Sequence, residues 1–460
     1  MTPRLRTAAG GALVAALLFA GLAWANPGGA QRLVNERLVE DIRPSDLLGG
    51  GDKVFVRFGA DAAFGVLWGN ATNPNHVYMV ALKARYLGVA QVVDESGRVV
   101  ADNVPVKYWT LYAVKLLDLV EYRDQDGDGI ANYTRGYDGA DFTTYTEDEP
   151  VFKRVDLNTT WTRGAIDRNS TASSRTWSFN LTATDLPYEG VNEGVVARGD
   201  NMLNLVRFTF HLRASLEEID NVTVPQWRVT VDTARPLRPV VTNVTRQGDL
   251  TWGGTIARYG LKWDQEIEGW DYEPGTPRRL LLEFGAIVGN LIPPGVANWI
   301  DDNLVHRTNE TGRARYESTA GNETIDNRTG SLSFARRLRS PTLDFEGDWT
   351  RVGRVTWVSN STVDGVTRPV YAQVLAGHRI VARGELGGAF LGFVLLGALS
   401  YDGGDRIAHD PEVTTDVIAA LVPPDGMTGV LIAVGVAVAV VLVGLLLLAS
   451  RRRKRLPRKP

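Results

Sequence analysis

The 460-residue chain contains no cysteine. This absence excludes disulfide scaffolds, zinc sites and iron–sulfur clusters held by thiolates, and thiol catalysis. Histidine is scarce, and the five histidines show no metal-ligand spacing, so we expect each of them at the surface. They are His76, His211, His306, His378 and His409. The chain also lacks the G-x-S-x-G, H-E-x-x-H, Walker and dinucleotide-binding motifs, so no motif indicates an enzyme class.

Long uncharged runs are few, and two of them lie near the ends of the chain. Residues 1–25 combine Arg4 and Arg6, an apolar run and an Ala-x-Ala pattern, which is typical of a secretory signal peptide. An uncleaved amino-terminal anchor is the alternative. Residues 427–450 carry no charge and are long enough for a transmembrane helix, and a basic tail, 451–460, follows at once. We therefore expect contact with membrane lipid, the amino terminus outside the cell and the carboxyl terminus in the cytoplasm. A buried core helix is the alternative for 427–450.

The remaining chain is long enough for two domains. Two prolines in residues 234–239 interrupt a β-ladder, so we divide the chain into 26–235 and 236–422, with a spacer at 423–426. Without the two arginines of the signal peptide and the seven basic residues of the tail, 41 basic side chains face 53 acidic ones, a net charge of about −12. A mildly acidic surface argues against nucleic acid as a partner.

Asparagine is unusually often followed by threonine two positions later. Eleven Asn-x-Thr sequons occur, where chance predicts about two. The asparagines are Asn70, Asn132, Asn158, Asn169, Asn180, Asn221, Asn243, Asn309, Asn322, Asn327 and Asn360. The pattern predicts N-glycosylation on surface loops and strand edges, with the compositional bias of a Thr-rich chain as the alternative. Sequons, signal peptide, anchor and missing cysteine together resemble the layout of archaeal cell-surface glycoproteins, which implies a place in the cell envelope.

Alternation of apolar and polar residues is common and favours β-strands. Residues 177–182, 206–214 and 227–232 each place apolar side chains on one face only, which is typical of antiparallel sheets with one face in water. Residues 94–97 and 364–365 carry the Asp and Gly chemistry of tight turns. Short helices are predicted at 114–120 and 278–288. The uncharged segment 386–399 indicates a buried strand pair, with a patch that touches membrane or partner subunits as the alternative.

One motif carries recognisable chemistry. Residues 124–130 read D-x-D-G-D-G-I, and carboxylates at alternate positions of a tight loop supply the oxygen ligands that calcium prefers. The segment 124–135 resembles the calcium loops of thrombospondin type 3 repeats and dockerins. By that resemblance Asp124, Asp126 and Asp128 bind through their side chains and Ile130 through its carbonyl. We add Asn132 and Asp138 as candidate ligands within the Asp-rich loop 124–141, with Asp141 as the alternative to Asp138. An acidic surface turn without metal is the alternative.

A second cluster, residues 263–271, places tryptophans beside carboxylates, as sugar-binding sites do. We favour core positions for Trp263 and Trp270, with Glu266 and Glu268 on one face of a strand. The sequence therefore predicts a mainly β protein with two antiparallel β-sandwich-like extracellular domains and one carboxyl-terminal transmembrane helix. Its predicted role is a structural or binding component of the cell envelope that engages surface glycans or other envelope proteins. A membrane-anchored extracellular hydrolase acting on polysaccharide or peptide is the alternative.

Overall fold

The computed structural model is mainly β, as the alternation predicts. It describes residues 36–40, 52–58, 62–131, 150–171, 173–190, 202–232, 240–275, 277–292, 313–318, 321–326, 331–338, 342–346, 351–356, 358–383, 389–410 and 412–413. Within these residues there are strands and turns and no helix. Every strand pair among them is antiparallel except the pair of β4 with β11.

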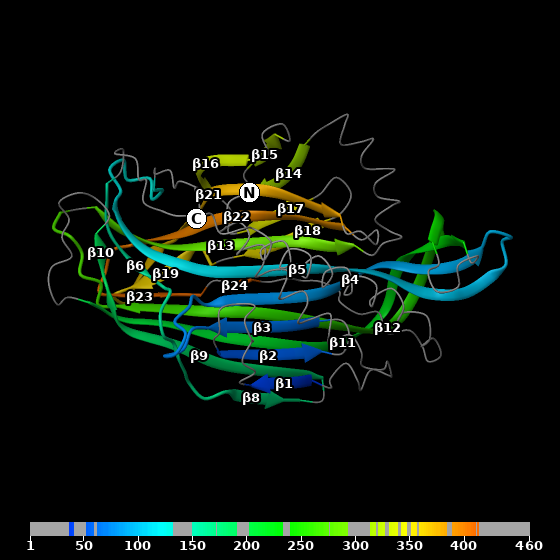
Figure 1. The fold of residues 1–460 in the computed structure, drawn as a ribbon, viewed down its shortest axis with the longest axis horizontal. Helices are drawn as coiled ribbons and strands as arrows, with labels where there is room; N and C mark the ends of the chain where they lie inside the picture. Colours follow the sequence, from blue (N-terminus) through cyan, green and yellow to red (C-terminus); the bar gives the residue numbers. More distant parts are fainter. Residues whose placement is uncertain are drawn as a thin grey trace, which may run out of the picture.

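Most strands lie in two layers (Figure 1). In order of pairing, the first layer contains β1 (Glu36–Glu40), β2 (Asp52–Phe58), β3 (Ala62–Trp68), β4 (Tyr78–Asp94), β5 (Val99–Arg123), β13 (Arg278–Ile292), β22 (Ala389–Asp402), β21 (Tyr371–Arg383) and β16 (Ser331–Leu338). Near the end of β5, β6 (Val151–Asp156) joins this layer and pairs with β10 (Glu189–Gly190).

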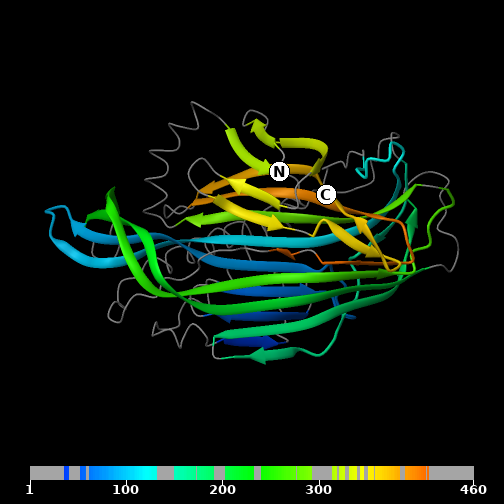
Figure 2. The same ribbon diagram turned by 180° about the vertical axis from the view of Figure 1, so that it is seen from behind.

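The second layer is brought to the front in Figure 2. It contains β7 (Thr162–Arg163) and β8 (Asp167–Ser170) on one side of β9 (Ser174–Pro187), then β11 (Met202–Asp232), β12 (Val240–Glu268), β23 (Arg406–His409) with β24 (Glu412–Val413), β19 (Asn360–Val363) and β20 (Val366–Pro369). A separate four-stranded sheet contains β15 (Gly321–Asp326), β14 (Arg313–Ser318), β17 (Thr342–Glu346) and β18 (Arg351–Thr356).

The two layers enclose an aromatic core. Trp68 of the first layer contacts Phe179 of the second at a ring-centroid distance of 6.2 Å, and Phe179 contacts Phe210 at 5.4 Å. On β11 the core side chains alternate with polar ones, because successive side chains of a strand point to opposite faces. Phe208 and Phe210 are fully buried, whereas the neighbouring Arg207 and Thr209 lie on the outer face.

Long hairpins join the layers at one end. The β4–β5 and β11–β12 hairpins extend together beyond the body, at the right of Figure 1. There Val89–Asp94 of β4 pairs in parallel with Gln226–Val231 of β11, so that four strands form one continuous sheet. The turn at the end of the β4–β5 hairpin is the predicted one: Asp94 accepts backbone hydrogen bonds from Ser96 and Arg98, and Gly97 has a positive φ.

The division at residue 235/236 falls between β11 and β12, which pair along most of their lengths. Residues from both sides of this division also pack in one hydrophobic cluster; Phe210 lies before it and Trp263 and Tyr401 after it. The two halves separated in the sequence analysis therefore share a core in the described part of the chain.

The predicted helices at 114–120 and 278–288 are wrong, because these residues belong to β5 and β13. Both strands are buried on both faces, so their apolar residues run on without alternation. Leu280 and Leu282 face the core between the layers, while Leu281 packs in a second cluster on the opposite face of the first layer. Most of the uncharged segment 386–399 lies in one strand, β22, and its described side chains, including Leu396 and Leu399, are buried.

A charged group is buried near the end of the body where β6 pairs with β5. Glu121 is 0% exposed and accepts hydrogen bonds from the Trp270 indole and the Glu273 backbone, both at 2.9 Å. Lys153 and Arg278 each approach its carboxyl oxygens to 3.8 Å. Burial raises the pKa of Glu121 despite these favourable contacts. This cluster fixes the loop after β12 against β5.

Candidate functional site

The Asp-rich loop begins directly after β5 and brings its three aspartates together. Carboxylate oxygens of Asp124, Asp126 and Asp128 all lie within 4.8 Å of one another. Asp124 accepts backbone hydrogen bonds from Gly127 at 2.8 Å and from Gly129 at 3.0 Å, which fold the loop around its carboxylate. Both glycines have positive φ, a conformation that side chains disfavour.

The loop is anchored to the first layer at its far end. The Gln373 side chain of β21 accepts a hydrogen bond from the Ala131 backbone N–H at 2.9 Å and donates one to the Ala131 carbonyl at 3.1 Å. Ile130 is buried beside it, and its backbone N–H donates to Asp128 at 2.7 Å. The candidate ligands Asn132 and Asp138 lie outside the described residues. The loop therefore presents three carboxylates on a fixed backbone.

The charges of the loop are only partly compensated among the described residues. Asp124 is 2% exposed, whereas Asp126 and Asp128 are open to solvent. Although Asp128 is exposed, partial desolvation of its carboxyl group within the loop raises its pKa, and the neighbouring carboxylates add to this effect against that of its backbone hydrogen bond. The Arg279 guanidinium lies 3.9 Å from Asp124. Binding a cation at the open side would relieve the repulsion between the carboxylates.

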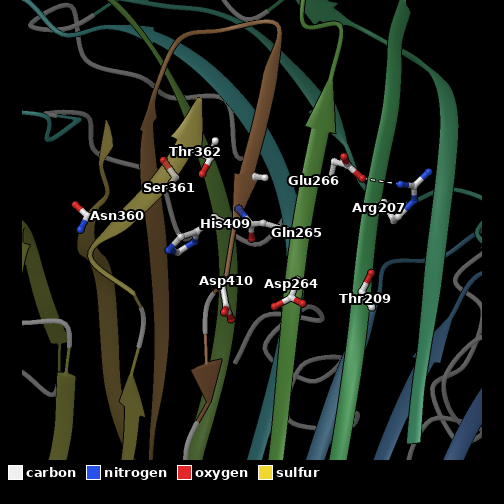
Figure 3. Close-up of a pocket in the computed structure, with 11 residues that line it drawn as sticks. Arg207, Thr209, Asp264, Gln265, Glu266, Asn360, Ser361, Thr362, His409 and Asp410 are labelled. Atoms are coloured by element: carbon white, nitrogen blue, oxygen red, sulfur yellow. Dashed lines mark hydrogen bonds and ion pairs between the residues drawn. The ribbon is translucent and has the colours of Figure 1, made fainter. Parts of the chain in front are cut away.

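A second polar feature is an open hollow of about 430 Å³ on the second layer. Its lining side chains come from β11, β12, β19 and from the β23 region (Figure 3). Arg207, Thr209 and Asp264 point to the outer face, opposite the aromatic core. Arg207 forms an ion pair with Glu266 at 2.6 Å. The lining contains no Phe, Tyr or Trp side chain.

Two carboxyl groups that line this hollow share one ammonium group. Lys262 lies 2.6 Å from Asp410 and 3.4 Å from Asp264. Burial raises the pKa of Asp410, and the adjacent Asp264 raises it further. Together these two causes outweigh Lys262, which lowers this pKa. Burial also works to raise the pKa of Asp264, but hydrogen bonds with Asp410 and His211 and the charge of Lys262 outweigh it and lower that pKa. Asp264 is therefore the more acidic of the two carboxyl groups.

His211 connects this hollow to a serine on β9. Its Nδ1 lies 2.9 Å from the Ser178 hydroxyl, and its Nε2 lies 2.9 Å from a carboxylate oxygen of Asp264. Sequence reasoning missed this contact, because 33 residues separate Ser178 from His211 and 53 separate His211 from Asp264. The only sequence signal is that each residue falls on the polar side of an alternating segment.

The other expectations for this region have mixed outcomes. Trp263 and Trp270 are core residues, 5% and 4% exposed, so neither provides a platform for a sugar. Glu266 and Glu268 do share a face, where both pair with Arg406. The expectation that every histidine lies at the surface is wrong for His409, which is 4% exposed. His409 ends the short strand β23, which lies between Asp405 and Asp410, and this polar surrounding did not predict its burial.

The sequon asparagines can be placed in part. Six have described side chains, and none of these six is buried. Asn158, Asn169, Asn243 and Asn360 are exposed, and Asn70 and Asn180 are half-buried. The side chains of the other five, Asn132, Asn221, Asn309, Asn322 and Asn327, lie outside the described residues.

The predicted signal peptide at 1–25, the spacer at 423–426, the transmembrane helix at 427–450 and the tail at 451–460 also lie outside the described residues. No helix long and apolar enough to cross a membrane occurs in the part of the chain that the structure describes. No protein-family model, no curated protein and no solved structure matches the chain.

Proposed function

We propose that this chain is a membrane-anchored, glycosylated component of the cell envelope with a structural or binding role. The observation that carries the proposal is the exposure of the sequons: all six asparagines with described side chains are accessible at the surface of the β-layers. Glycans need such positions, because a bulky polar group cannot be placed in a packed core. The filled aromatic interior also favours a structural or binding role over catalysis in an enclosed cleft.

Intact-mass and peptide mass spectrometry of the full chain from its native membrane test the proposal. Asn169→Gln on the edge strand β8 should remove one glycan mass, whereas Asn73→Gln, at an exposed asparagine outside any sequon, should not change the mass beyond the substitution itself. Protease added to intact cells should trim the outer part of the chain. A chain without sugar at any asparagine, or one that intact cells protect, contradicts the proposal.

The Asp-rich loop supports a second element of the proposal, calcium binding by Asp124, Asp126, Asp128 and the Ile130 carbonyl. The three convergent carboxylates support it, and oxygen ligands are those that calcium prefers. The role of the ion is to stiffen the loop after β5. The partners engaged by the outer surface are proposed to be surface glycans or other envelope proteins.

Calcium titration of the purified full chain, followed by its melting temperature, tests this element. At an ion concentration 100 times the dissociation constant, binding to the folded state contributes about 2.7 kcal/mol. Asp126→Asn should abolish the calcium-dependent rise in melting temperature, while Asp185→Asn, at an exposed aspartate on β9, should retain it. If millimolar calcium leaves the wild-type melting temperature unchanged, the loop is a surface turn.

A further inference from the structure

Three side chains from three neighbouring strands form a hydrogen-bonded row on the outer face of the second layer. Ser178 of β9 stands directly opposite His211 of β11, and Asp264 of β12 lies diagonally across from His211. The distances are 2.9 Å from the Ser178 hydroxyl to His211 Nδ1 and 2.9 Å from His211 Nε2 to Asp264. Nucleophile, base and orienting carboxylate are thus connected in the order that acyl-transfer enzymes require.

The partners of His211 assign the positions of the protons. An ionised carboxylate can only accept hydrogen bonds, so the ring nitrogen facing Asp264, Nε2, carries the hydrogen. In the neutral ring Nδ1 is then a lone-pair acceptor, and the Ser178 hydroxyl donates to it. A neutral histidine that accepts a hydrogen bond from a serine hydroxyl can remove its proton during attack on a carbonyl carbon; here the accepting nitrogen is Nδ1, whereas serine proteases use Nε2.

The row is accessible from solvent. The His211 and Asp264 side chains are 38% and 40% exposed, and Ser178 is half-buried. By contrast, the hydrogen bond between Tyr401 and His409 is buried. The Ser178 row therefore combines the geometry of a reactive serine with an open approach.

The surroundings indicate the class of substrate. Asp264 also lines the open hollow, whose hydroxyl and guanidinium groups include Thr209 and Arg207. Such a lining fits a hydroxyl-rich group rather than a hydrocarbon chain. Arg213 is exposed on the same face of β11, two residues from His211, where its charge can stabilise an oxyanion formed at Ser178.

We propose that Ser178, His211 and Asp264 form a serine esterase centre that removes short acyl groups from hydroxyl-rich molecules such as O-acylated sugars.

The Ser178 oxygen bonds to the ester carbonyl carbon while its proton moves to His211 Nδ1. The bond from this carbon to the alcohol oxygen then breaks, and the alcohol leaves with that proton. Water attacks the acyl-serine, giving its proton to Nδ1, and the carboxylic acid is released as the proton returns to Ser178. Asp264 is a positioning residue. This activity does not depend on the envelope role proposed above.

Labelling of the full chain with a fluorophosphonate, followed by peptide mass spectrometry, tests the nucleophile directly. The probe should modify Ser178 in the folded chain but not in heat-denatured protein. Ser178→Ala should abolish labelling and hydrolysis of 4-nitrophenyl acetate and glucose pentaacetate.

His211→Gln should lower the rate of ester hydrolysis by about 100-fold or more, the contribution expected of a general base. Asp264→Asn should lower kcat more than it changes KM, since it alters the tautomer of His211 while it changes only one of the polar groups that line the hollow.

The matched control is Ser174→Ala, at a serine on the same strand and face that lies opposite Ser215 rather than a histidine. This variant should label and hydrolyse esters as the wild type does. The proposal is overturned if folded wild-type protein does not react at Ser178, or if Ser178→Ala retains the wild-type rate. Equal losses in Ser174→Ala and Ser178→Ala also overturn it, because the serine opposite His211 would then have no special role.

Discussion

The buried His409 makes the stability of this fold sensitive to acid. Its Nε2–H donates to the Val358 carbonyl at 2.7 Å, and its Nδ1 accepts from the Tyr401 hydroxyl at 3.0 Å. The Gln265 side chain donates in turn to Tyr401 at 2.5 Å, so the whole chain of hydrogen bonds requires a neutral histidine. Burial lowers the pKa of His409 from 6.5 to about 4, outweighing the hydrogen bond to Val358. Protonation would remove the acceptor and place a charge in the core.

The sign and size of the effect follow from linkage. The folded-state pKa is depressed, so the stabilisation is fully present above pH 6.5 and is lost as the pH falls from 6.5 through about 4. Integrated down to pH 4, the loss is about 3 kcal/mol, because each tenfold change in proton affinity corresponds to about 1.4 kcal/mol. That is a large part of the net stability of a typical protein.

Urea unfolding of the full chain at pH 7.5 and pH 4, followed by tryptophan fluorescence, measures this loss. His409→Gln retains a donor for Val358 but does not titrate, so the wild type should lose about 3 kcal/mol more than the variant between these pH values. Tyr401→Phe, which keeps the titrating ring, should keep most of the wild-type pH dependence. Parallel losses in the wild type and His409→Gln would refute the reasoning.

Two further predictions concern the free energy of unfolding, measured by urea denaturation at neutral pH. Glu121→Ala should destabilise by about 3–5 kcal/mol, because it removes the buried carboxylate that Lys153 and Arg278 share. Glu189→Ala, in an exposed ion pair with Arg154, should cost under about 1 kcal/mol. Similar losses in the two variants would exclude a special role for the buried carboxylate. Gly129→Ala should cost about 1–3 kcal/mol more than Gly97→Ala. Both glycines have positive φ, but only at Gly129 would the added methyl group overlap a side chain, the ring of Tyr371. Equal losses in the two variants would show that the backbone conformation alone determines the cost.

The alternation of apolar and polar residues predicted those strands of this fold that expose one face to solvent and bury the other. On β9 and β11 the alternation of residues 177–182 and 206–214 matches burial residue by residue, because a two-residue period is visible in the sequence. The same reasoning failed at 114–120 and 278–288, since strands buried on both faces have no such period. The Asp-rich loop was predicted as a cluster because its three carboxylates lie within five residues and one turn brings them together.

The sequence by itself therefore determined the alternating strands, the hairpin turn at 94–97 and the convergence of Asp124, Asp126 and Asp128, all of which depend on neighbours along the chain. Only the tertiary structure decided what depends on strand register. Pairing of β9 with β11 and of β11 with β12 places Ser178, His211 and Asp264 in one row, and a shift by one residue would turn one of these side chains into the core. The same long-range pairing buries His409 beneath Tyr401, because register and layer packing are set by contacts between residues far apart in the chain.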